Sequence, residues 1–206
     1  MVARSAVAAL TVLPAVVATA LGQEGPALTV ALRDATPPEI VVRFEGLFTR
    51  IEFLDALRSG FPLYVAHHAA LRQSQTFKDR TVDDFLWEYV VLFDPVRDRF
   101  ALETGDGATE VLPDRTALER RLAAAYVVGL EPDGSGSFYY ETTVEARMLS
   151  DEDVDEAFAW LRGANSDSVK LRDPGFFGRL ARRVLVRVTT LPHVRLKART
   201  AEFGVP

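Results

Sequence analysis

Residues 137–148, SFYYETTVEARM, decide how this chain folds, because two sets of side chains alternate along them. The first set is mostly apolar and comprises Phe138, Tyr140, Thr142, Val144, Ala146 and Met148. The second set is mostly polar and comprises Tyr139, Glu141, Thr143, Glu145 and Arg147. Successive side chains of a β-strand point to opposite faces. The alternation therefore predicts a long strand with one face in the core and the other in water.

The same period of two recurs on the N-terminal side of this stretch. Residues 28–32 and 40–44 each place apolar side chains at alternate positions, on either side of a Thr-Pro-Pro breaker, and residues 63–71 also have the composition of a strand. Residues 82–93 predict the longest strand, which is apolar on both faces and so is expected to be central or covered by a helix. The turn-forming residues 94–98 predict a hairpin to residues 100–104. Short strands are also expected at 126–130 and 194–200.

Helical spacing is confined to a few segments between the predicted strands. Residues 47–59 repeat apolar side chains at Leu47, Ile51, Leu54 and Leu57, and Gly60 is placed to end the helix. Asp114 is expected to cap a helix over 114–126, and Ser150 to open another over 151–162. Residues 176–188 favour a helix, although residues 184–190 also alternate as a strand would. The fold class expected is α+β and mainly antiparallel β: a β-sandwich-like sheet of seven to nine strands with three or four peripheral helices.

Composition limits the classes of function. The 206 residues include no cysteine, so disulfides, thiolate nucleophiles and cysteine-based metal sites are excluded. The net charge of −5 argues against general nucleic-acid binding, which needs an excess of Lys and Arg. We expect no cofactor.

The N-terminus has the pattern of an export signal. Arg4 precedes an apolar run that ends in Ala18-Thr19-Ala20, with small residues at the positions a signal peptidase reads. We expect residues 1–22 to be a signal peptide and residues 23–206 to form a single mainly-β domain. The alternative that the segment stays attached as a membrane anchor remains open. The expected location is the periplasm or cell envelope.

Several segments together resemble a family of exported bacterial proteins known as domain of unknown function 4390. The resemblance rests on the signal peptide, residues 54–63 (LDALRSGFPL), the aromatic strand around Trp87 and Tyr89, residues 112–114 (LPD) and the Tyr139-Tyr140 strand. It spans about residues 28–161, and the charged residues 151–200 depart from the shorter C-terminus of that family. The resemblance implies an envelope location in Gram-negative-type bacteria and genes that often neighbour those of membrane sensor kinases. It supplies no catalytic residues.

Residues that often carry catalysis do not form a recognisable pattern here. His67, His68 and His193 are the only imidazoles, and on a strand the first two point to opposite faces, so we expect no shared metal site. A Gly-x-Ser-x-Gly elbow is absent from the sequence. The aromatic row Phe85, Trp87, Tyr89 is read as sheet core in preference to the lining of a groove. We therefore expect no enzymatic activity.

Charge is distributed unevenly along the chain. Residues 170–199 contain nine basic residues and one acid, whereas residues 103–156 contain 14 acids and four arginines. The basic stretch is a candidate contact surface for an envelope protein or an anionic membrane surface. The favoured interpretation is that its apolar stripe packs into the core and leaves the arginines in water. The residues of this candidate surface are Arg179, Arg182, Arg183, Arg187, Arg195, Lys197 and Arg199.

These observations support two hypotheses of different class. The first is a non-catalytic accessory or interaction module of the cell envelope that uses exposed strand edges and the basic stretch. The second is a small-molecule or lipid-binding module with a pocket between sheet and helix. A large cavity would favour the second hypothesis.

Overall fold

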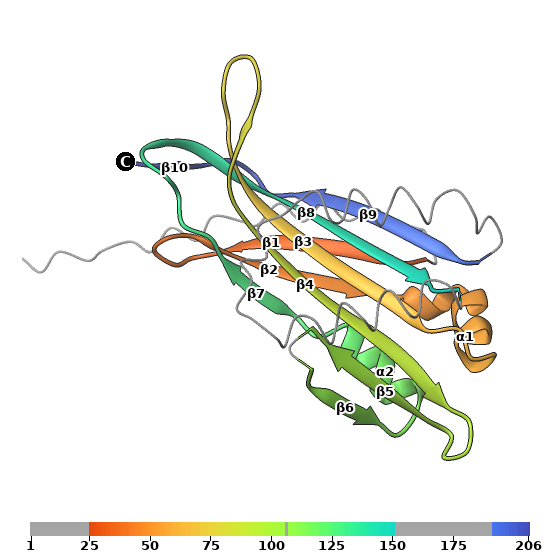
Figure 1. The fold of residues 1–206 in the computed structure, drawn as a ribbon. Coiled ribbons are helices and arrows are strands. Elements are labelled where there is room, and N and C mark those ends of the chain that lie inside the picture. Colours follow the sequence, from red (N-terminus) through yellow and green to blue (C-terminus); the bar gives the residue numbers. More distant parts are fainter. Residues whose placement is uncertain (1–24, 106, 151–190) are drawn as a thin grey trace, which may run out of the picture.

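Strands dominate the structure, which is a computed structural model that describes residues 25–105, 107–150 and 191–206. The described residues contain ten strands in two antiparallel sheets, two α-helices and one short 3-10 helix (Figure 1). The strands are β1 (Ala27–Arg33), β2 (Glu39–Glu45), β3 (Leu63–Gln73), β4 (Arg80–Asp94), β5 (Arg99–Thr104), β6 (Thr109–Leu112), β7 (Tyr126–Gly129), β8 (Gly136–Met148), β9 (His193–Arg199) and β10 (Phe203–Val205). The helices are η1 (Leu47–Thr49), α1 (Ile51–Arg58) and α2 (Arg115–Leu122). The predicted mainly antiparallel β class is confirmed.

The strands divide unequally between the sheets. The small sheet has the order β1-β2-β7. The large sheet has the order β10-β8-β3-β4-β5-β6, and β9 pairs with β8 on the same side as β10. The alternating residues 137–148 lie in β8, which pairs with β3 along residues 138–148 and therefore organises the large sheet.

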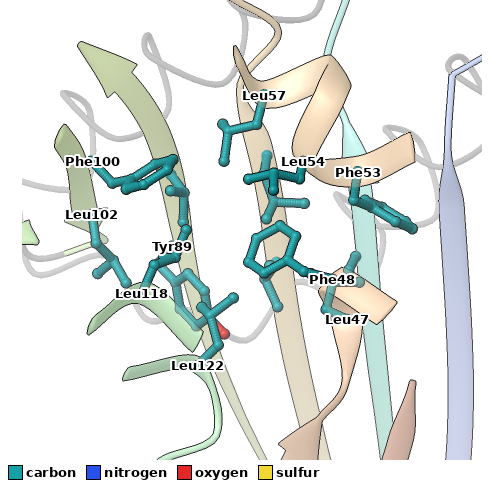
Figure 2. Packing of buried hydrophobic residues seen from close by; sticks show 14 of the residues in the cluster. Leu47, Phe48, Phe53, Leu54, Leu57, Tyr89, Phe100, Leu102, Leu118 and Leu122 are labelled. Carbon is teal, nitrogen blue, oxygen red and sulfur yellow. The ribbon is translucent and has the colours of Figure 1, made fainter. Parts of the chain in front are cut away.

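The apolar set of β8 and its counterparts on β3 and β4 face the small sheet, and two buried clusters fill the space between them. Figure 2 shows the larger cluster, in which side chains from η1, α1 and α2 pack against β4 and β5. The smaller cluster joins Ile40 and Val42 of β2 to Leu71 of β3 and Tyr140 of β8. The hydroxyl of Tyr140 donates to the carbonyl of Pro38 at 2.8 Å, so this buried tyrosine also ties the two sheets together by a hydrogen bond.

The first predicted helix, over residues 47–59, is divided in the structure into the short helix η1 and the helix α1. Arg50 is extended and separates η1 from α1, so Leu47 lies in a turn of its own. Ile51, predicted to face inward, is 54% exposed, and Phe53 is buried in its place. The predicted end is confirmed, because Gly60 follows α1 with a φ of 97° that favours glycine.

The second predicted helix begins as expected and ends early. The carboxylate of Asp114 accepts a hydrogen bond from the backbone N–H of Ala117 at 2.8 Å, which is an N-cap. The helix stops at Leu122 instead of Tyr126, because Tyr126 is already paired with Val42 as the first residue of β7. The tertiary pairing of β7 thus overrides local helical spacing.

Other predictions fall outside the described residues or were incomplete. The helices predicted over 151–162 and 176–188, the choice between helix and strand at 184–190, and the signal peptide at 1–22 all lie outside the part of the chain that the structure describes. Within that part, β6 and β10 were not predicted. They have four and three residues, too few for an alternating pattern to stand out.

Candidate functional site

The predicted basic surface is partly visible on β9. Its alternate residues Arg195, Lys197 and Arg199 are exposed and share one face of the strand. Val194 and Leu196 point the other way and pack against the larger core cluster. The remaining predicted residues of this surface, Arg179, Arg182, Arg183 and Arg187, lie outside the described residues.

Two of the three cations on β9 are held in place by β8. The ammonium of Lys197 lies 2.7 Å from a carboxylate oxygen of Glu141, which also pairs with Arg72 at 3.1 Å. The guanidinium of Arg199 lies 4.7 Å from the centroid of the Tyr139 ring. Arg195 is exposed and makes no ion pair with a described residue.

A second group of interest is the aromatic cluster on the inner face of β4. The Trp87 ring lies 5.6 Å from that of Phe85 and 5.1 Å from that of Tyr126 on β7, measured between centroids. Phe85 is 48% exposed, whereas Trp87 and Tyr126 are half-buried. The row Phe85, Trp87, Tyr89 was predicted to be sheet core. Only Tyr89 is fully buried, whereas Trp87 is half-buried and Phe85 is exposed.

Behind this cluster lies a buried imidazole. His67 is fully buried, and its ring stacks on that of Trp87 with centroids 4.8 Å apart and planes 6° apart. Its Nε2 atom lies 3.2 Å from the hydroxyl of Tyr89. Burial lowers the pKa of His67 to about 3, so the ring is neutral at physiological pH. The imidazole therefore acts as a polar member of the aromatic stack.

The other two histidines lie on the opposite face of the large sheet. His68 and Asp84 are 3.2 Å apart, and His193 and Glu145 are 3.6 Å apart. The expected opposite orientation of His67 and His68 is confirmed. No group of three or more His, Asp or Glu side chains within the described ranges is arranged to hold a metal ion.

Sequence reasoning missed a buried polar group on the outer face of the large sheet. Glu88 is 6% exposed and accepts a hydrogen bond from the hydroxyl of Tyr64. The Arg147 guanidinium lies 4.9 Å from the centroid of the Tyr64 ring. Burial raises the pKa of Glu88 to about 7, against the opposing effects of Tyr64 and Arg147. The available signal was a lone carboxylate between Leu86 and Val90 on the predicted apolar face of the longest strand.

A pocket of about 540 Å³ lies between the end of β2, η1 and α2. Buried side chains of Phe44, Phe48 and Leu122 contribute to its lining. The guanidinium of Arg115 at its rim pairs with Glu119 at 2.8 Å. The pocket thus has an apolar interior and a charged rim, as sites for small amphiphilic ligands do.

The described residues define a two-sheet antiparallel β protein with a basic face on β9 and an aromatic cluster on β4. Nothing among the described residues points to an enzymatic activity, and no helix among them combines the length and apolar character needed to span a membrane. Comparison with protein-family models, with curated proteins and with solved structures gave no match.

Proposed function

We propose that this protein is a non-catalytic interaction module of the bacterial cell envelope, which binds an acidic partner protein through the exposed face of β9. The observation that carries the proposal is the row formed by Arg195, Lys197 and Arg199 on a strand at the side of the large sheet. Because Lys197 and Arg199 are held by neighbours on β8, the row loses little side-chain entropy on binding. The envelope location rests on the signal-like N-terminus and on the resemblance to domain of unknown function 4390.

The absence of cysteine makes a direct test possible. A single cysteine at Arg195 can carry a photoactivated crosslinker, and the same change at Arg43, an exposed arginine on the small sheet, is the matched control. We expect crosslinking in the native envelope from position 195 to one acidic protein, and none to that protein from position 43. Crosslinking that is equal from both positions would contradict the proposal.

Charge reversal separates the protein partner from a lipid surface. Arg195→Glu is expected to weaken binding to the crosslinked partner at least tenfold, whereas Arg43→Glu leaves it unchanged, because a reversed charge turns attraction into repulsion. Vesicles of anionic lipid are the second probe. The protein alone could bind these vesicles and lose that binding on Arg195→Glu. This result would mean that β9 binds the membrane surface and not a partner protein.

A second candidate function, the binding of a small amphiphile, is favoured by the pocket between β2, η1 and α2. The exposed Arg120 on its rim makes no ion pair with a described residue and suits an acidic headgroup. Titration with a fluorescent fatty acid tests this function. Leu122→Trp, which fills the pocket, is expected to abolish binding, and Arg120→Ala to weaken it, while Arg43→Ala has no effect.

A further inference from the structure

Among the described strands, none pairs with one side of β4 along more than half of its length. This strand has 15 residues, and its neighbour β5 has six. The strand β5 pairs with the segment Tyr89–Asp94 only, and β3 pairs with the other side of β4 along almost its whole length. No described strand pairs with the remaining nine residues, 80–88, on the side that continues the line of β5. Their outward N–H and C=O groups form a row roughly 30 Å long at 3.3 Å per residue.

The strand β7 lies alongside this row without pairing to it (Figure 1). It belongs to the small sheet, and its only described partner is β2. Contact between β4 and β7 is made by the rings of Trp87 and Tyr126, 5.1 Å apart. Among the described residues, the backbone of 80–88 is therefore unpaired on the side toward β7, where the rings of Trp87 and Tyr126 lie.

We propose that this open row of β4 binds an extended, basic peptide segment of a partner protein, which adds a strand to the large sheet. Strand addition gives affinity through main-chain hydrogen bonds and specificity through pockets for alternate side chains. Phe85 and Trp87 provide the apolar contact on the inner side of the row, where the added strand places every second residue.

The acidic side chains along residues 80–88 favour a basic peptide as the added strand. Asp83 and Asp84 are consecutive in the open row and point to opposite faces of the sheet, and Asp83 makes no ion pair with a described residue. Asp84 is 3.2 Å from His68, and the only described cation of the row, Arg80, is paired with Asp133 at 3.2 Å. A second copy of this edge would bring like charges together, which disfavours antiparallel self-pairing. A segment with Lys or Arg beside apolar residues has the complementary pattern.

This inference is independent of the proposed binding at β9, which lies on the other side of the large sheet, beyond β3 and β8. The two surfaces also differ in charge. If experiments disprove binding at one of these two surfaces, the proposal for the other surface still stands.

Hydrogen exchange in the free protein gives the first test. About every second amide of residues 80–88 should exchange fast, because only half of them face β3. Slow exchange of all these amides would show that the row is already occupied, and would overturn the proposal.

A library of random dodecapeptides displayed on phage is the probe for the ligand. We expect selected peptides to combine alternate apolar residues with Lys or Arg, and to slow exchange at residues 80–88. Phe85→Ala should lower the affinity for the selected peptides at least tenfold, and Asp83→Asn should lower it several fold. Val111→Ala, which truncates an exposed apolar residue on the edge strand β6, is the matched control and should leave binding unchanged.

Four outcomes would overturn the proposal. The first is selected peptides that protect β9 or another strand in place of residues 80–88. The second is an equal effect of Phe85→Ala and Val111→Ala on peptide binding. The third is recovery of no peptide above background. The fourth is a dimer of the protein in which residues 80–88 become protected.

Discussion

Replacing Glu88 by Gln should change how the stability of this protein depends on pH. The carboxyl group is buried on the outer face of the large sheet, where it accepts a hydrogen bond from Tyr64. Its pKa is raised from 4.5 to about 7, and the largest cause is burial. The folded state therefore holds the proton more tightly than the unfolded state does.

The sign and size of the effect follow from this difference. Stability from the raised pKa is fully present below about pH 4.5 and is lost as pH rises through 7. At roughly 1.4 kcal/mol per pH unit, the free energy of unfolding falls by about 3 kcal/mol across this window. The glutamine side chain keeps the shape of the protonated carboxyl and does not titrate. The variant should match the wild type near pH 4 and exceed it by about 3 kcal/mol near pH 8.5.

Urea unfolding at a series of pH values, followed by tryptophan fluorescence, measures both free energies. Glu103→Gln, which removes a half-buried carboxylate from β5, is the control for losing a negative charge from the same sheet. A stability difference between wild type and Glu88→Gln that stays constant from pH 4 to 8.5 would refute the reasoning. So would a variant less stable than the wild type at the alkaline end, since it would mean that ionised Glu88 stabilises the fold.

Three further predictions concern stability alone and are read from the same unfolding curves at neutral pH. Leu57→Ala should cost about 3 kcal/mol, because the side chain is fully buried in the larger cluster; a loss below about 1 kcal/mol would contradict its place there. Asp114→Ala should cost about 1 kcal/mol through the lost cap of α2, and Asp114→Asn much less, since the amide oxygen still accepts the hydrogen bond; equal losses would argue against the cap. Lys197→Ala should cost less than about 1 kcal/mol, because its ion pair is exposed on the lysine side; a larger loss would mean that this lysine is structural.

Alternation was the most reliable guide to this fold. The strands with a clear period of two, β2 and β8 above all, were predicted from their sequences, because a one-residue error would move every apolar side chain to the wrong face. Turn residues were equally informative: the hairpin at residues 94–98 and the glycine after α1 occur where their chemistry places them. The sequence could not place Ile51, because the break at Arg50 rotates α1 relative to η1.

The candidate sites were harder to predict, since each depends on contacts between distant segments. The basic face of β9 could be expected from its alternating charges. The position of Glu88 between Leu86 and Val90 on an apolar face was a local signal for its burial, but its neighbours Tyr64 and Arg147 come from other strands and could not be predicted. The pairing of His67 with Tyr89 and Trp87 likewise arises from the register of β3 against β4.

The open row on β4 shows a general reason for such failures. The pattern of residues 82–93 predicts a strand that is central or covered by a helix, and among the described strands β4 has neighbours on both sides only where β5 reaches it. Whether a strand is an edge depends on the length of the next strand, and β5 ends at Thr104. An unequal pair of hairpin strands is thus readable in sequence as a long alternating run followed by a short one. The unmatched part of the longer strand is where an unpaired backbone, and with it a site for an added strand, should be sought.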